Sequence, residues 1–215
     1  AHGLVGSEMC IRDSPKPVLS ATQLREQTSR RAAAGLGYNE CVSYSFIDEN
    51  SAKLFGGGDA STQLENPISS EMSHMRPDLF PGLLQAASRN QARGFFNMAL
   101  FELGPVFNGG DPGNQQNNLS GVLIGQTASK DVHGQDREVD VFDVKCHIEN
   151  ILSLIGAPSK FQILRGAESH WHPGRHGRIC LGPKKTIGIF GELHPKILSS
   201  FDIKGPTVGF TILPV

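Results

Sequence analysis

The stretch NPISSEMSHMRPDLFPGLLQAASRNQARGFFNMALFELGPVF, residues 66–107, is the part of the chain around which the rest can be placed. Proline at position 77 stops regular structure, and Asp78 then stands where a helix N-cap is expected. Gly94 supplies the end of that helix. The helix is predicted to bury one face whose residues recur every four positions: Leu79, Leu83, Ala87 and Gln91.

The last part of this stretch, residues 96–103, is mostly apolar and predicts a strand that is buried on both faces. Glu102 lies within that strand, and a buried carboxylate needs a partner. We therefore expect Glu102 to be a structural residue that accepts hydrogen bonds from the backbone or from an arginine, rather than a relic of a substrate site.

The same residues resemble a known family. NPISSEMSHMRPDLFPGLLQAASRN followed by LFELGPVF is similar to the catalytic-core-like domain of bacterial phenylalanyl-tRNA synthetase beta subunits. Four later segments agree in the same order: FDVKCHIENIL, HPGRHGRI, IGIFGELHPKIL and FDIKGPTVGF. The resemblance extends from residue 20 to residue 215. It implies an α+β fold with a class II aminoacyl-tRNA synthetase-like antiparallel sheet flanked by helices.

Composition sets limits on the class of protein. A chain of 215 residues fits one large domain, and we expect residues 15–215 to form it. The net charge of −1 gives no overall basic field for nucleic acid. The 4 cysteines are scattered without a CxxC pair, which favours reduced thiols and a cytoplasmic location. No apolar run approaches the roughly 20 residues of a membrane span.

The first 14 residues, AHGLVGSEMCIRDS, match nothing in the family. Part of this segment looks like translated sequencing-adapter sequence. We expect residues 1–14 to be a foreign or disordered leader without function.

A helix is predicted over residues 20–34, with a capping box formed by Ser20 and Gln23. Glycines at positions 35 and 37 end it, and residues 40–47 then alternate partly, as in a strand. The order of helix, short link and strand resembles the first motif of class II synthetases, which usually builds a subunit interface in that family. The alternative is an ordinary helix packed on the sheet of its own domain.

The stripe that would form this contact is narrow and consists mainly of small side chains, which suits close approach of another helix. Flanking arginines could pair with acidic residues of a partner at the rim. The predicted interface residues are Leu24, Thr28 and Ala32.

The remaining elements follow from periodicity and turn residues. Asp140 is expected to cap an amphipathic helix whose apolar face comprises Val141, Val144, Ile148, Ile151, Leu152 and Ile155. The other expected elements are a short helix over 49–55, a polar loop over 108–118, a strand over 121–125, a surface connection over 129–140, strands over 161–164, 178–181 and 186–190, a helix opened by Pro195, and a last strand over 207–213.

The resemblance also shows what is missing for catalysis. Class II synthetases use arginines to bind the phosphates of ATP, one of them two residues before the acidic residue that Glu102 matches. Leu100 stands at that position, and residues 205–215, which match the third motif, contain no arginine. We therefore expect no catalytic or substrate-binding residue in this domain and no cofactor bound by it. ATP and magnesium would serve the holoenzyme.

The histidines of HWHPGRH, His170, His172 and His176, are close enough in sequence to suggest zinc. The Pro-Gly pair within the motif breaks the geometry, and no cysteine lies nearby. A turn packed around Trp171 is the preferred interpretation, and no metal site is predicted. Five arginines are interpreted as solvated residues rather than tRNA contacts: Arg76, Arg89, Arg93, Arg175 and Arg178.

The resemblance implies a non-catalytic core domain of the beta subunit. Its partner would be the alpha catalytic subunit, which it supports during ATP-dependent attachment of phenylalanine to tRNA, and tRNA would be reached through the holoenzyme. Two alternatives remain: a class II ligase domain that is active by itself, and a tRNA-binding module.

Overall fold

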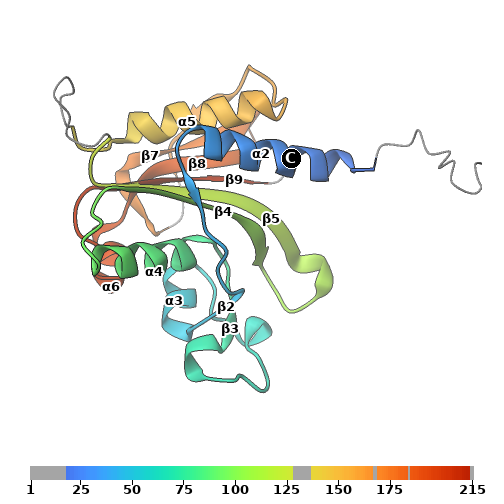
Figure 1. The fold of residues 1–215 in the computed structure, drawn as a ribbon. Helices are drawn as coiled ribbons and strands as arrows, with labels where there is room; N and C mark the ends of the chain where they lie inside the picture. The colour runs from blue at the N-terminus through green and yellow to red at the C-terminus, as the bar shows by residue number, and fades with distance from the viewer. Residues whose placement is uncertain (1–17, 128–136, 167–168, 184, 214–215) are drawn as a thin grey trace, which may run out of the picture.

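The computed structural model of the chain describes residues 18–127, 137–166, 169–183 and 185–213. The predicted leader, residues 1–14, lies outside the described residues, as do residues 129–136 of the predicted surface connection. A central sheet separates two layers of helices (Figure 1). The predicted α+β fold, a sheet flanked by helices, is confirmed.

The main sheet has seven strands, and its neighbours are antiparallel except for β1 and β4, which are parallel. In spatial order the strands are β1 (Asn39–Glu40), β4 (Met98–Phe107), β5 (Gln115–Ile124), β9 (Thr207–Ile212), β8 (Lys185–Leu193), β7 (Trp171–Leu181) and β6 (Gln162–Leu164). A separate two-stranded sheet pairs β2 (Phe46–Ile47) with β3 (His74–Met75).

Each face of the main sheet carries its own apolar core. On one face lie α2 (Ala21–Gly35) and α5 (Val141–Leu154), and on the other lie α3 (Glu49–Leu54), α4 (Phe80–Gln91) and α6 (Pro195–Ser200) (Figure 1). Short 3₁₀ turns complete the described chain: η1 (Ala60–Thr62), η2 (Ser70–Met72) and η3 (Pro112–Asn114).

Local capping explains where the helices begin. The predicted box of Ser20 and Gln23 is present at α2, and Asp140 forms a second box with Asp143 at α5. In both boxes the side chains satisfy amides of the first turn that have no partner inside the helix. The predicted apolar face of α5 is confirmed at its centre, where four residues are fully buried: Val144, Ile148, Ile151 and Leu152.

Helix α4 begins slightly later than predicted. Its first residue is Phe80, followed by Pro81, and Leu79 rather than Asp78 is the residue that precedes it. Asp78 still accepts a hydrogen bond from the Phe80 amide, at 3.0 Å. The predicted stripe at every fourth residue from Leu79 to Gln91 is buried throughout, which confirms the face of this helix.

Three strand predictions were wrong in their bounds. Residues 40–47 do not form one strand, because the chain leaves β4 after Cys41 and reaches β3 only at Phe46. Strand β5 begins at Gln115, inside the predicted polar loop, because its polar residues pair with the end of β4. Strand β7 begins at Trp171, and the HWHPGRH segment is an irregular strand end instead of a turn.

Among the described residues, no helix has both the length and the apolar character needed to cross a membrane.

Candidate functional site

A buried ion pair joins β4 to the segment that precedes α4. Arg76 Nη1 lies 2.6 Å from Glu102 Oε1, and the two side chains are 3% and 4% exposed. Arg76 Nε donates to the carbonyl oxygen of Pro105 at 2.8 Å. Ser43 Oγ donates to Glu102 Oε2 at 2.6 Å, so the carboxylate has partners on both oxygens. These bonds compensate for the loss of solvation that burial imposes on both charges.

Two glycines beside this network carry no side chain and so make room for it. A Cβ at Gly82 of α4 would lie 2.2 Å from Ser43 Oγ, and a Cβ at Gly104 would lie 2.6 Å from Arg76 Nη2. Both distances are far too short, so a larger residue at either position would displace the pair. The network therefore depends on helix α4 and strand β4 as well as on its charged members.

These contacts determine the roles of the two charged residues. Glu102 is a structural carboxylate with an arginine partner, as predicted. The prediction that Arg76 is a solvated residue was wrong, because the sequence gives no sign that position 76 lies against β4. Both carboxylate oxygens of Glu102 accept hydrogen bonds from Ser43 or Arg76, which fixes the side chain inside the domain.

Leu100 and strand β9, which resemble the arginine-bearing parts of the catalytic motifs, carry no charged side chain. Leu100 of β4 is buried and pairs with Val122 of β5. Every residue of β9 is buried, and none is charged. The ring of Phe80 lies against β9, where a Cβ at Gly209 would come within 2.8 Å of it. An aromatic side chain therefore fills the space over the centre of this face of the sheet.

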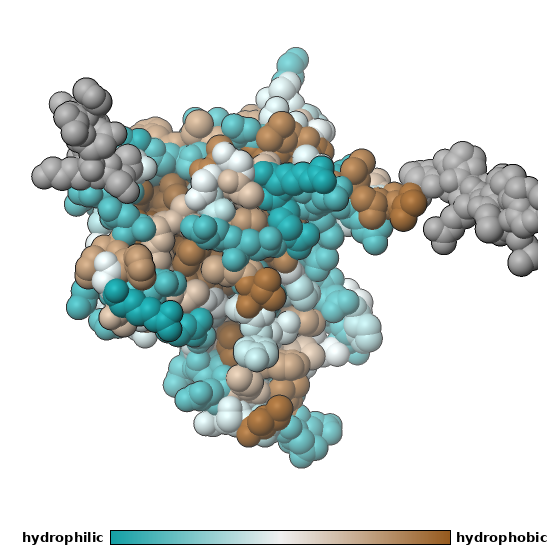
Figure 2. All heavy atoms as spheres, in the orientation of Figure 1, coloured by the Kyte–Doolittle hydropathy of each residue, from teal (hydrophilic) through white to brown (hydrophobic). Residues whose placement is uncertain are grey.

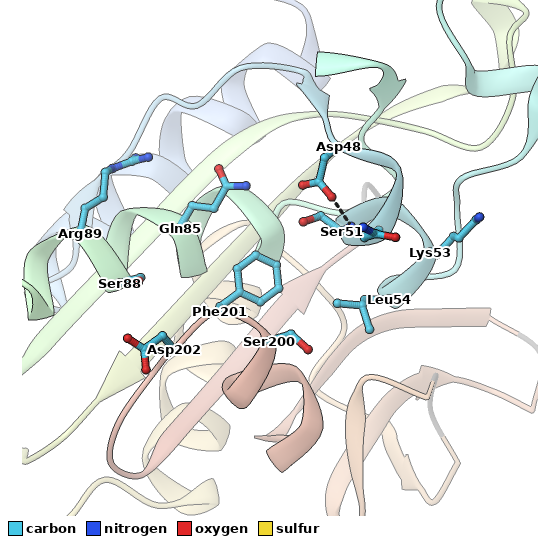
Figure 3. Close-up of a pocket in the computed structure, with 11 residues that line it drawn as sticks. Asp48, Ser51, Lys53, Leu54, Gln85, Ser88, Arg89, Ser200, Phe201 and Asp202 are labelled. Carbon is cyan, nitrogen blue, oxygen red and sulfur yellow. Dashed lines mark hydrogen bonds between the residues drawn. The ribbon is translucent and has the colours of Figure 1, made fainter. Parts of the chain in front are cut away.

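A polar pocket of about 850 Å³ lies between α3, α4 and α6. Figure 3 shows Asp48 beside Ser51 on one side and Arg89 with Asp202 on the other, with their charged ends apart. Asp48 accepts from the Ser51 amide as the cap of α3. Lys53, at the rim, pairs with Glu49. These contacts account for Asp48 and Lys53 as local helix interactions, so the pocket assembles no catalytic set.

The histidines considered as zinc ligands bond mainly to the backbone. His172 Nδ1 accepts from the Gly174 amide, and His176 bonds to the His172 carbonyl and the Gly166 amide. His170 is buried among aromatic rings. Burial lowers its pKa to about 4. Within the described ranges, no group of three or more His, Cys, Asp or Glu side chains could hold a metal ion.

The predicted interface residues on α2 differ in exposure. Leu24 is 55% exposed, and its carbonyl accepts the Thr28 hydroxyl at 2.8 Å. Ala32 packs partly against the core shared with α5, beside fully buried Ala33. The stripe is therefore exposed in the first turns of α2 and packs against the core of its own domain near the end of the helix. Its role in an interface stays a prediction.

Sequence reasoning missed an exposed apolar segment between β1 and β2, on the side of the sheet that carries α4. Val42, Tyr44 and Phe46 are 92%, 75% and 38% exposed. They line an open groove of about 900 Å³ whose other side is formed by α4. Figure 2 shows apolar side chains gathered beside the start of α2 and again over the part of the molecule below the sheet. The signal was the β-type character of residues 40–47, which was interpreted as one strand with partial alternation.

The fold is also found in solved structures of other proteins. The chain resembles the solved structure of PylSc, a pyrrolysyl tRNA synthetase from Desulfitobacterium hafniense, with a TM-score of 0.64 and 18% sequence identity. The match covers 88% of this chain and 65% of that chain. At this identity the likeness supports the class II synthetase-like fold alone.

Sequence comparison is more specific. The family model described as "Phenylalanyl tRNA synthetase beta chain CLM domain" matches residues 9–213. The chain is 63% identical over 200 residues to the phenylalanine–tRNA ligase beta subunit of Ruegeria pomeroyi, and 59% identical over 199 residues to that of Cereibacter sphaeroides. Each match covers 93% of this chain and 25% of the relative, so the chain spans a quarter of their length. The chain belongs to the phenylalanyl-tRNA synthetase beta-chain family, and the part that it represents is the CLM domain.

Proposed function

We propose that this domain is a non-catalytic scaffold within a phenylalanine–tRNA ligase, where it supports an alpha catalytic subunit. The observation that carries this proposal is the absence of a cation at the matching sheet positions: Leu100 and strand β9 offer no positive charge to the phosphates of ATP. Phosphoryl chemistry on ATP requires positive charge close to the phosphates. ATP and magnesium would therefore be bound elsewhere in the holoenzyme.

The domain by itself is expected to have no adenylation activity. Phenylalanine-dependent exchange of pyrophosphate into ATP should stay at the level of a buffer control, because the developing charge has no counter-charge. Exchange clearly above that control would support the alternative of an independent class II ligase domain. The alpha subunit, assayed in the same buffer, is the positive control.

The partner surface is proposed to combine the exposed turns of α2 with the apolar segment of residues 42–46. Leu24, Val42 and Tyr44 are large apolar side chains that remain exposed in the isolated chain. Exposed apolar groups are typical of protein interfaces, and these lie in two places, on the α2 side and on the α4 side of the sheet. A stable subunit interface would bury about 1,600 Å² or more in total.

Leu24→Glu is expected to weaken assembly with the alpha subunit by about 30-fold, since it places a charge in an apolar contact. Ala32 is a poorer test position because it packs against its own core. Ala34→Glu is the matched control: Ala34 is exposed on the same helix and lies off the stripe. Equal affinity of the two variants in a pull-down titration would place the interface elsewhere.

A direct role in tRNA binding receives less support. The net charge is −1, and two of the arginines considered for tRNA, Arg76 and Arg175, are paired with glutamates. A tRNA-binding module would show affinity that falls steeply with salt. We propose that tRNA is contacted by the holoenzyme and that the protein works in the cytoplasm, consistent with unpaired cysteines among the described residues.

A further inference from the structure

A second pocket, of about 520 Å³, opens on the face of the sheet that carries α4. Its floor includes Asn118 of β5, Ile189 of β8 and Thr211 of β9, and one wall is formed by Phe55 and Trp171. It is separate from the buried ion pair and from the exposed apolar segment. Nothing in the proposed scaffold function uses it.

Two side chains of this pocket carry buried polar atoms without a partner. Asn118 Oδ1 and Trp171 Nε1 have no hydrogen-bond partner within the described part of the chain. The residues are 5% and 2% exposed. One atom is an acceptor and the other a donor, and an unpaired buried group of either kind is costly. Two such groups in one pocket point to a ligand that presents both a donor and an acceptor.

The walls indicate the shape of that ligand. The ring centroids of Phe55 and His170 are 4.9 Å apart, and those of His170 and Trp171 are 5.3 Å apart. These rings pack directly against one another and form a continuous aromatic wall, against which a planar aromatic guest can pack. Burial lowers the pKa of His170 to about 4, so its ring is neutral at physiological pH.

The described lining of the pocket offers no lysine or arginine to a phosphate or carboxylate guest. Among the described residues that line it, none is lysine or arginine, and Asp78 contributes a carboxylate. The described lining therefore supplies no lysine or arginine to balance an anionic guest. The remaining polar groups of the described lining are amides, hydroxyls, the Trp171 indole and the His170 imidazole.

We infer that this pocket binds a small, uncharged, planar heterocycle or aromatic amide, held by the Trp171 indole N–H and the Asn118 amide oxygen. Free nucleobases or nucleosides and aromatic carboxamides share this chemistry. In both, a ring carries a hydrogen-bond donor and an acceptor on its edge.

The chain offers a direct probe because Trp171 is its 1 tryptophan. In a ¹H–¹⁵N spectrum of the chain, a single indole N–H resonance should move downfield and saturate when adenosine or nicotinamide is added. The two probes distinguish the two sources. Toluene, which fills an apolar space without hydrogen bonds, is the apolar comparison and should leave the resonance near its original position.

Asn118→Ala is expected to weaken binding about tenfold, because one hydrogen bond in a buried site is lost. The affinity is measured with whichever probe saturates the indole resonance. Asn117→Ala is the matched control, since Asn117 is exposed and its amide bonds to Glu26 at 2.7 Å instead. Trp171→Phe keeps the ring and removes the N–H, so calorimetry on this variant should show a similar loss.

The inference is overturned if neither probe moves the indole resonance at about 10 mM, a concentration that would detect weak binding. It is also overturned if toluene produces the same shift, or if Asn118→Ala and Trp171→Phe bind as tightly as the parent chain. Pyrophosphate exchange and assembly with the alpha subunit are measured separately, so failure here leaves the scaffold proposal intact.

Discussion

Glu102→Ala should lower the free energy of unfolding by about 3–5 kcal/mol, one of the largest losses expected from a single change in this domain. The variant leaves the guanidinium of Arg76 buried without its carboxylate partner. It also removes the acceptor of the Ser43 hydroxyl. Urea denaturation monitored by circular dichroism measures the change.

The matched control is Glu192→Ala, which breaks the pair between Arg175 and Glu192. That pair also has a short contact, 2.8 Å, but its side chains are 60% and 26% exposed. Solvent screening should limit the loss there to about 1 kcal/mol or less. Similar losses for both variants would mean that burial does not set the strength of the Arg76–Glu102 pair.

A double variant separates the charge from the packing. Arg76→Met with Glu102→Leu removes both charges and keeps apolar volume, so it should recover much of the stability lost in Glu102→Ala. A double variant no more stable than Glu102→Ala would show that the hydrogen bonds to Ser43 and Pro105 contribute most of the effect.

The helices were predictable because their signals are local. The Ser20 and Asp140 boxes and the four-residue repeat of α4 are all contained within a few turns of chain. The need of Glu102 for a partner could also be predicted, since an acidic residue inside an apolar strand has few alternatives. The identity of that partner was not predictable, because Arg76 reaches β4 from 26 residues away.

The strand errors have the same origin. Gln115 and its polar neighbours look like a loop until their pairing with Phe107 and the end of β4 is known. The segment after Cys41 has β-type residues, yet it leaves the sheet and exposes Val42 and Tyr44. Strand partners lie far away in sequence, so composition alone cannot decide between pairing and exposure. The pocket with Asn118 and Trp171 was unpredictable for the same reason.

Ile148→Asp should cost about 5 kcal/mol or more, enough to leave the domain largely unfolded at physiological temperature. Ile148 is fully buried at the centre of α5. A Cβ at Gly188 of β8 would lie 2.7 Å from Ile148 Cδ1, which shows how closely the helix meets the sheet. Aspartate would lose this packing and place a carboxylate in the apolar core between the helix and the sheet.

Two companion variants on α5 separate the possible causes. Ile148→Val removes one methylene and should cost about 1 kcal/mol, with the fold preserved. Asn150→Asp introduces the same carboxylate on the exposed side of the helix and should leave the melting temperature within a few degrees of the parent. A cost for Ile148→Asp no greater than that of Asn150→Asp would contradict the burial of this position. A large cost for Ile148→Asp alone would assign the effect to the buried position, through the desolvated charge and the lost packing together, because Asn150→Asp places the same carboxylate in solvent.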